Sequence, residues 1–473
     1  MQIARFIDEY FKELEAGNAA VFAGAGLSVP AGYVDWRELL RPLAEELGLN
    51  IDLESDLVAV AQFHVNENGN NRHRLHQAVI EALSADNPPT ENHRLLARLP
   101  IATWWTTNYD KLIETALKDA GNIVDVKSAV PQLANTRPRR DAVVYKMHGD
   151  VDRPMEAVAT RDDYERYHKE RGAFINALSG DIVSKTFLFL GFSFTDPNLE
   201  HVLSRVRITF ENNQRRHYAI FRKRKKLSTE SDELFEQAKI RQALVLQDLK
   251  RFNIRAVLID EYSEITDILR ELELRFRRQT VFVSSAAAVF EPWGEEAVTN
   301  FMRALGSALI SAGVRVSTGL GLGVGNALLT GAIEQIMRER NMHIEDALVV
   351  RPFPHAIRDP EERAVIWEKY RQEIIGMSGI AIFLFGNKRV GSKIEPSAGM
   401  RREFEIAKNR NLVVLPIGAT GSICEQLVGE VFADEALDAT TRDALKSMST
   451  PTADLMSLID PIIKLVKKLR EGK

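Results

Sequence analysis

The sequence Ala-Ala-Val-Phe-Ala-Gly-Ala-Gly-Leu-Ser at residues 19–28 decides the fold of the N-terminal half. Its first part, Ala19–Ala23, is short, apolar and free of charge, which is typical of a strand buried on both faces. The motif Gly24-Ala25-Gly26 follows at once. Glycines at the end of a strand let the backbone approach a ligand phosphate, and the N-terminus of a following helix favours its charge. The stretch predicts a nucleotide-binding strand and glycine turn, with a purely structural turn as the alternative.

Similar apolar stretches recur along the chain, with room for helices between them. In the first half they are Ile101–Thr106, Val143–Met147, Phe187–Leu190, Tyr218–Phe221 and Ile254–Ile259, and in the second half Val281–Ser284, Val314–Ser317, Ala347–Val350, Ile380–Phe385 and Leu412–Pro416. Strands that alternate with helices indicate a parallel sheet covered on both faces. We therefore predict an α/β protein with two Rossmann-like, doubly wound parallel-sheet domains in tandem, residues 1–279 and 280–473.

The length and composition of the chain agree with two globular domains and exclude some classes of function. A chain of 473 residues exceeds the size of one hydrophobic core. It carries 62 Lys and Arg against 66 Asp and Glu, so no broad positive field favours nucleic acid. The single cysteine, Cys424, excludes a zinc site built from several thiolates. We expect a cytoplasmic protein that needs no metal, binds no nucleic acid and does not enter a membrane. The one basic run, Arg222–Lys226, is expected to be a solvated loop.

Several polar motifs accompany the glycine turn in the first half. They are Asp35-Trp36-Arg37, Thr107-Asn108-Tyr109-Asp110, His148-Gly149-Asp150 and Gly191-Phe192-Ser193. Taken singly, a strand-end Asn is often a turn former and a lone His is often a satisfied polar group. Together, at the strand ends of one predicted sheet, they favour a ligand site.

These motifs, in this order, resemble those of the sirtuin-like NAD-binding family. The resemblance implies NAD as the substrate, bound by Gly24, Ala25, Gly26, Ser28, Asp35, Arg37, Asp110, Gly191 and Ser193. It implies that Asn108 contacts the ribose or orients water and that His148 accepts a proton, since an amide and a neutral imidazole suit these tasks. By the same resemblance, Asp110 supports the pocket, Arg37 faces nicotinamide or phosphate, and Ser193 contacts the adenosine half. In the next segment, Asp196 and Asn198 are expected only to form a turn around Pro197.

One departure from the sirtuin pattern affects the expected reaction. Sirtuin deacylases carry a small zinc domain, but residues 151–181 of this chain hold no cysteine and have a helical pattern. We therefore expect water to be the acceptor, which makes the protein an NAD glycohydrolase. A zinc-free deacylase and a non-catalytic nucleotide sensor that acts by assembly stay open as alternatives.

The second half has a glycine-rich loop of its own. Gly319-Leu-Gly-Leu-Gly-Val-Gly325 follows a predicted strand and precedes a predicted helix, as a phosphate-binding loop does. This half resembles the SLOG family of nucleotide-binding domains. The resemblance implies binding without turnover, with Ser284, Gly321, Gly323, Arg371, Lys388 and Glu403 as ligand contacts.

A sirtuin-like domain followed by SLOG resembles the NAD-hydrolysing effectors of bacterial Thoeris anti-phage systems. The resemblance implies that a cyclic ADP-ribose isomer, made by a TIR-domain protein, binds the SLOG domain and activates NAD cleavage. It also implies a homotetramer that can form larger assemblies. The amphipathic N-terminal stretch, Ile3–Leu14, is a candidate for the subunit interface.

Overall fold

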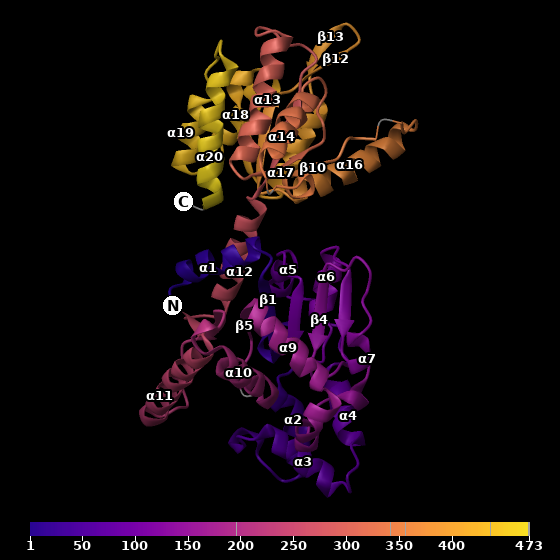
Figure 1. Ribbon diagram of the computed structural model, residues 1–473, viewed down its shortest axis with the longest axis vertical. Helices are drawn as coiled ribbons and strands as arrows, with labels where there is room; N and C mark the ends of the chain where they lie inside the picture. Colours follow the sequence, from indigo (N-terminus) through magenta and orange to yellow (C-terminus); the bar gives the residue numbers. More distant parts are fainter. Residues whose placement is uncertain (195, 341, 355, 436, 472–473) are drawn as a thin grey trace. The chain divides into compact units, whose positions relative to one another are not determined.

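The computed structural model describes residues 1–194, 196–340, 342–354, 356–435 and 437–471. The chain divides into two compact units, Met1–Glu273 and Leu274–Lys473 (Figure 1). The division falls inside helix α12 (Ser263–Arg277). Each unit contains its own parallel sheet, which confirms the predicted α/β class and the tandem arrangement of two Rossmann-like layers.

The first unit is built on a seven-stranded parallel sheet with the order β3-β4-β2-β1-β5-β6-β7. Its strands are β1 (Ala19–Ala23), β2 (Thr103–Thr106), β3 (Val124–Lys127), β4 (Ala142–Lys146), β5 (Thr186–Leu190), β6 (His217–Arg222) and β7 (Ile254–Ile259). From β1 the chain moves to β2 on one side, and after β4 it returns to β5 on the other side. A crevice forms where the strand order reverses in this way, at the carboxyl ends of the strands.

Helices cover this sheet and form a separate layer beside it. They are α1 (Ile3–Glu15), α2 (Trp36–Glu46), α3 (Leu57–Glu67), α4 (His73–Ala82), α5 (Glu91–Ala97), α6 (Leu112–Asp119), α7 (Val130–Leu133), α8 (Arg161–Glu170), α9 (Gly172–Ser184), α10 (Pro197–Phe210), α11 (Asp232–Leu249) and α12, with short 3₁₀ turns η1 (Ala25–Leu27), η2 (Val29–Ala31), η3 (Ile51–Leu53), η4 (Pro154–Glu156), η5 (Glu211–Asn213) and η6 (Lys250–Phe252). One core joins the sheet to α9 and α10. Another joins α2, α3 and α4 to each other and to Tyr109, next to the crevice.

The second unit has a five-stranded parallel sheet with the order β10-β9-β8-β11-β14 and a separate antiparallel hairpin, β12–β13. The strands are β8 (Thr280–Ala286), β9 (Arg315–Thr318), β10 (Leu348–Val350), β11 (Ile380–Phe385), β12 (Asn387–Val390), β13 (Lys393–Pro396) and β14 (Val413–Pro416). The helices are α13 (Glu295–Ser311), α14 (Gly325–Arg338), α15 (Ile344–Ala347), α16 (Pro360–Gly376), α17 (Ala398–Asn409), α18 (Ile423–Phe432), α19 (Ala439–Ser447) and α20 (Ile459–Glu471), with the turns η7 (Gly418–Thr420) and η8 (Leu455–Leu458).

Two parts of the strand pattern were not predicted from the sequence. Strand β3 alternates Val with Asp125 and Lys127, whose charges indicate a loop when read alone. In the fold these side chains are only 9% and 4% exposed and their charged atoms lie 2.9 Å apart, so pairing offsets much of the cost of burial. The β12–β13 hairpin is largely exposed and therefore has no apolar pattern to reveal it.

The apolar face of the N-terminal helix α1 packs against its own unit. Its buried residues are Phe6, Ile7, Tyr10, Phe11 and Leu14. They pack within the first unit, where the Tyr10 hydroxyl donates to the carbonyl of Ala20 at 3.0 Å. The Phe6 ring lies 5.1 Å from that of Tyr218. The apolar face of α1 is thus already used by its own sheet.

The basic run after β6 is neutralised by acidic neighbours. Lys223 lies 2.9 Å from Asp260, and Lys226 lies 2.6 Å from Asp232. Arg224 and Lys225 are paired in the same manner with Glu230 and Glu261, whereas Arg222 lies over the ring of Tyr262. Along the described ranges of the chain, no helix combines the length and apolar character required to cross a bilayer.

Candidate functional site

The polar motifs of the first unit meet at the carboxyl edge of its sheet. The turn Gly24–Ser28 follows β1, Asn108–Asp110 follows β2, His148–Asp150 follows β4, and the segment from Gly191 follows β5. Parallel strands end at one edge, and β1, β2 and β5 are direct neighbours there. The fold thus brings together motifs that are far apart in the sequence.

The glycines of this edge hold two turns in backbone contact. Gly26 N donates to Gly191 O at 3.0 Å, and Gly24 N donates to Leu190 O at 2.9 Å. A Cβ atom on Gly24 would lie 2.4 Å from Gly191 O, and one on Gly191 would lie 2.2 Å from Leu27 N. Gly191 also has a φ of +63°, which favours glycine. These glycines are required for the packing of the two turns, whatever ligand binds beside them.

Asn108 lies in a buried hydrogen-bond network with fixed orientation. Its Nδ2 donates to Gly24 O at 3.1 Å and to Ser28 Oγ at 3.0 Å, and Ser28 Oγ donates to Asp110 Oδ2 at 2.7 Å. The other Asp110 oxygen accepts from Leu112 N at 3.0 Å. Both donors of the amide are therefore engaged. Its Oδ1 has no protein partner among the residues that the structure describes, so this acceptor can serve a substrate hydroxyl or a water molecule.

Lys146 is a buried lysine that was not predicted from the sequence, and it supports this network. Lys146 is 0% exposed, and its Nζ donates to the carbonyls of Tyr109 and Asp110 at 3.0 and 2.6 Å. It also contacts the carboxylates of Glu114 and Asp150 at 3.1 and 2.5 Å. Burial acts to lower the pKa of Lys146, but the two carboxylates outweigh burial and hold this pKa above its usual value. The cation ties the turn after β2 to the turn after β4.

His148 faces a carboxylate from the segment after β5. Its Nε2 lies 3.0 Å from Asp196 Oδ2, with the two side chains 8% and 7% exposed. His148 Nε2 makes no hydrogen bond in this arrangement, so the contact is a close approach of the ring to the carboxylate. The Tyr164 hydroxyl donates to the same oxygen at 3.1 Å. Burial acts to raise the pKa of Asp196, but His148 and these hydrogen bonds hold that pKa below its usual value.

Asp196 does more than form the turn expected from its sequence. Its other oxygen, Oδ1, accepts from Leu199 N at 2.9 Å and caps α10. The Asp-Pro pair signals this helix cap in the sequence, but nothing local indicates the contact with His148.

Two other predicted substrate contacts lie at the same edge of the sheet. Ser193 lies exposed in the segment after β5. Ala25 begins the turn η1.

Two further predicted substrate contacts are occupied elsewhere. The Asp35 side chain accepts from Glu38 N at 2.9 Å and caps α2. The Arg37 guanidinium donates to the carbonyls of Ile51 and Glu54. These contacts hold the α2 layer together, and the structure does not join Asp35 or Arg37 to Asn108 and His148.

In the second unit, three of the predicted ligand contacts converge. Ser284 Oγ donates to Glu403 Oε2 at 2.6 Å, and Arg371 Nε lies 3.5 Å from Glu403 Oε1. Arg371 also lies against the rings of Phe353 and Trp367, at 5.1 and 5.7 Å from their centres. Burial raises the pKa of Glu403, although Ser284 and Arg371 oppose this shift. A carboxyl, a guanidinium and aromatic faces are groups that can bind the hydroxyls, phosphates and base of a nucleotide.

The glycine loop of this unit packs against the end of β8. A Cβ atom on Gly321 would lie 1.5 Å from Ser285 O, and one on Gly323 would lie 2.0 Å from Ala287 O. Both glycines are therefore required by backbone contact. Lys388 lies on the β12–β13 hairpin opposite Glu395. In the described part of the chain, no contact joins it to the Ser284–Arg371–Glu403 cluster.

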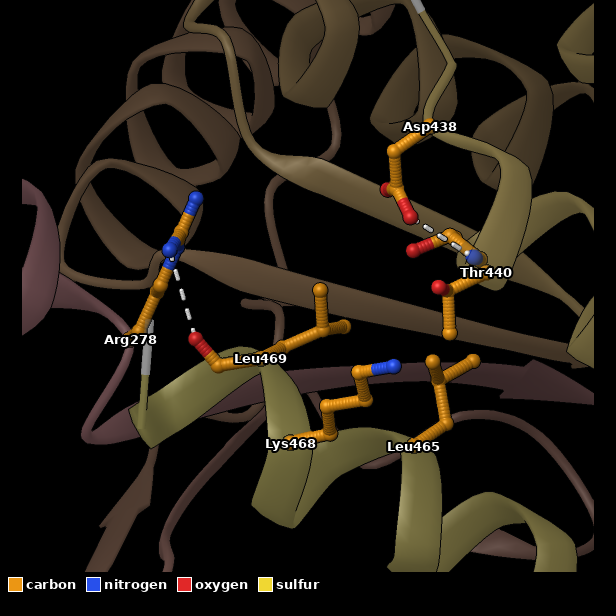
Figure 2. Close-up of a pocket in the computed structure, with 7 residues that line it drawn as sticks. Arg278, Asp438, Thr440, Leu465, Lys468 and Leu469 are labelled. Carbon is orange, nitrogen blue, oxygen red and sulfur yellow. Dashed lines mark hydrogen bonds between the residues drawn. The ribbon is translucent and has the colours of Figure 1, made fainter. Parts of the chain in front are cut away.

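Two cavities lie outside the predicted residues. One, of about 160 Å³, is in the second unit and includes Arg278, Asp438, Thr440, Leu465, Lys468 and Leu469 in its lining (Figure 2). The other, of about 460 Å³, lies in the first unit and is partly lined by Ala157 and Val158. Val158 N donates to His148 O at 2.9 Å, so this second cavity adjoins the turn that carries His148. Among the residues described, no group of three or more His, Cys, Asp or Glu side chains is arranged to hold a metal ion.

Comparison with known proteins identifies a matching family for each half and relatives of the whole chain. A SIR2-like domain family matches residues 102–243, and the Sir2- and TIR-associating SLOG family matches residues 264–469. Proteins named NAD(+) hydrolase ThsA from Acinetobacter baumannii and Bacillus cereus are 46% and 44% identical to this chain, cover 98% of it, and are themselves covered over 97% and 98% of their lengths. A protein of the same name from Cytobacillus dafuensis is 40% identical over 99% of this chain and 97% of its own length. The chain belongs to the ThsA family of NAD(+) hydrolases.

Proposed function

We propose that this protein is an NAD⁺ glycohydrolase of bacterial anti-phage defence, which releases nicotinamide and ADP-ribose when a nucleotide signal binds its second unit. The observation that carries the proposal is the joint placement of Asn108 and His148 at the carboxyl edge of the first sheet, held there by Ser28, Lys146 and Asp196. The full-length relatives named NAD(+) hydrolase support the same reaction.

The reaction requires few groups. The bond between the nicotinamide nitrogen and the ribose C1′ breaks, and its electrons leave with nicotinamide. A water oxygen bonds to C1′ and loses a proton. Asn108 Oδ1 is placed to hold the water or a ribose hydroxyl, because the amide donors are engaged in the protein. His148 accepts the proton, and Asp196 stabilises the imidazolium that results.

The activator is proposed to be a cyclic ADP-ribose isomer supplied by a TIR-domain protein. The family that matches the second unit is described as Sir2- and TIR-associating, which supports such a pairing. The ligand would bind at the cluster of Ser284, Arg371 and Glu403, beside the glycine loop that contains Gly321 and Gly323. Its phosphates suit Arg371 and Lys388, and its hydroxyls suit Glu403. A homotetramer is the proposed assembly, since subunit rearrangement can hold a toxic activity low without signal.

Nicotinamide release from NAD⁺ tests this function. The purified full-length protein is incubated with NAD⁺, with and without cyclic ADP-ribose isomers, and nicotinamide and free ADP-ribose are quantified. Asn108→Ala and His148→Ala are expected to lower the stimulated rate by at least about 100-fold. The control His168→Ala, on an exposed part of α8, is expected to keep the wild-type rate.

Two results would contradict the proposal. The first is a folded wild-type protein that releases no nicotinamide with any isomer. The second is cleavage that occurs only with an acylated peptide and yields an acylated ADP-ribose, which would identify a deacylase.

A further inference from the structure

The smaller of the two cavities contains two positive charges that no acidic side chain neutralises at close range. It lies wholly in the second unit and has a volume of about 160 Å³. Arg278 lines it from the connection between α12 and β8, and Lys468 lines it from α20. Among the residues described, neither cation forms an ion pair, and the Arg278 guanidinium donates only to the carbonyl of Leu469, at 3.3 Å. Most of the hydrogen-bond donors of these two side chains are therefore available to a ligand.

The first turn of α19 supplies another wall of the cavity. Thr440 and Thr441 belong to this wall, and a hydroxyl can donate to an anion. Asp438 also lines the cavity, but its carboxylate caps α19 by accepting from Thr441 N at 2.9 Å. Burial acts to raise the pKa of Asp438, but hydrogen bonds from Thr441 and from the helix backbone hold that pKa below its usual value. This carboxylate is therefore ionised, and the two cations still leave the lining with a net positive charge.

The groups that can bind an anion approach the cavity from different directions. In Figure 2, Arg278 lies on one side, Thr440 lies on the other, and the Lys468 side chain extends from α20 between them. Leu465 and Leu469 supply the apolar part of the lining. Three separate parts of the chain thus surround one small space, unlike a row of exposed lysines along a single helix.

The size and charge of the cavity define the class of ligand. Pockets that enclose a drug-sized molecule usually measure about 300–1,000 Å³. A space of about 160 Å³ is better suited to a small group than to a whole nucleotide. A guanidinium presents paired N–H donors to the oxygens of a phosphate, and an ammonium adds a compact positive charge. A single phosphate group therefore matches both the volume and the donors.

We propose that this cavity binds a phosphate group, held by Arg278 and Lys468 with a hydrogen bond from the Thr440 hydroxyl. The phosphate is either inorganic or the terminal group of a nucleotide. The site shares no residue with the cluster that contains Arg371 and Glu403, so the proposal depends neither on NAD⁺ cleavage nor on an activator at that cluster. Because Arg278 directly follows α12, a bound phosphate would also link this connection to α19 and α20.

A phosphorus NMR titration of the full-length protein in phosphate-free buffer tests the site, with inorganic phosphate and AMP as separate probes. Lys468→Gln should weaken the binding of inorganic phosphate at least about tenfold, because one charge-assisted hydrogen bond is lost. Lys468→Arg should retain most of the affinity, because it keeps the charge and the N–H donors. Arg371→Ala should leave the affinity unchanged, because Arg371 belongs to the other cluster.

Lys464→Gln is the matched control, because Lys464 is exposed on the same helix but is not part of the lining. It removes the same charge and should leave the affinity unchanged. AMP that binds more tightly than inorganic phosphate would identify a nucleotide as the source of the phosphate group, whereas equal or weaker binding of AMP would identify inorganic phosphate. No binding of either probe, equal losses in Lys464→Gln and Lys468→Gln, or a loss in Arg371→Ala alone would overturn the proposal.

Discussion

At the level of single residues, two buried side chains that were not predicted as site residues hold the active-site candidates in place. Lys146 fixes the backbone turn that carries Asn108, and Asp196 faces the ring of His148. Both supporting groups are buried charges, which are costly to bury unless they are paired. Their pairing therefore makes the geometry of the two reactive groups resistant to rearrangement.

Asp196→Asn tests the support of His148 without removing the helix cap. Asn is as good a cap for α10 as Asp, so the fold should survive, but the negative charge that stabilises a protonated His148 is lost. We expect kcat to fall on the order of 100-fold while KM changes by less than about threefold. Steady-state kinetics with the activator present measure both constants. Asp152→Asn, at an exposed carboxylate paired with Lys111, is the control and should behave as wild type. An equal loss in Asp152→Asn, or a change in KM alone, would argue against a positioning role for Asp196.

At the scale of elements, two turns from separate strands depend on each other. The turns after β1 and β5 approach so closely that neither Gly24 nor Gly191 has room for a Cβ atom. Because Asn108 donates to the carbonyl of Gly24, a shift of this contact would also shift the amide. Strand packing and site geometry are thus coupled through backbone atoms.

Two substitutions, Gly191→Ala and Gly17→Ala, distinguish the effect of the close contact between the turns from the effect of backbone strain. Both glycines have similar positive φ values, +63° and +68°, but a Cβ atom on Gly17 would meet nothing within 4 Å. Gly17→Ala should cost about 1–2 kcal/mol of unfolding free energy, the penalty of the left-handed conformation. Gly191→Ala should cost about 1–3 kcal/mol more because of the overlap with Leu27, and it should also lower kcat. Urea denaturation and kinetics provide the measurements. Equal losses for the two variants would show that the close approach is unimportant.

Helix α1 is attached to the sheet by a contact that depends on pH. Burial acts to raise the pKa of Glu9, but hydrogen bonds from Arg5, Tyr218 and Arg216 lower it to about 2. A carboxyl with a depressed pKa in the folded state stabilises the fold above its unfolded pKa of about 4.5. This contribution is lost as the pH falls through about 2. We expect thermal unfolding of Glu9→Gln to differ from wild type at pH 7 and to converge with it between pH 4 and pH 2. A constant difference over this range would mean that the charge of Glu9 is not responsible.

At the scale of the whole molecule, the proposal requires the two units to be coupled thermodynamically. An activator at Arg371 and Glu403 can raise NAD⁺ cleavage at Asn108 only if it binds the active and inactive states with different affinity. Such coupling is reciprocal for binding, and its usual size is about 5- to 150-fold. If the activator raises the affinity for NAD⁺, the substrate must tighten the binding of the activator by the same factor.

Binding measurements with Asn108→Ala, which is expected to hold NAD⁺ without cleaving it, test the reciprocity. The affinity for the cyclic ADP-ribose isomer should increase when NAD⁺ saturates the protein, by the same factor as the isomer increases the affinity for NAD⁺. Arg371→Ala should weaken binding of the isomer while leaving NAD⁺ binding without isomer unchanged. Identical isomer affinities with and without NAD⁺ would exclude coupling through substrate binding.

The fold class and most of the strands could be predicted from the sequence, because an apolar run indicates a buried strand and a following glycine turn indicates a close approach of the backbone. The parallel strands β1, β5, β7 and β11 lie where the apolar pattern predicted them. The local sequence also identified Asn108 and His148 as candidate site residues. Both follow predicted strands, and the carboxyl ends of parallel strands lie at one edge of the sheet.

The side chains that support those candidates could be identified only from the folded structure. Lys146 and Asp196 bear no local mark of their role, because their partners are distant in the sequence and meet them only when the strands align. The Asp125–Lys127 pair of β3 is a similar case. These charged residues are typical of a loop when the sequence is read alone, but in the fold they are buried and paired with each other. Contacts in the fold also explain why Asp35 and Arg37, although they stand in the expected motif, serve the α2 layer. Patterns of burial are local properties of a chain, whereas charge pairing and ligand contact are properties of the folded molecule.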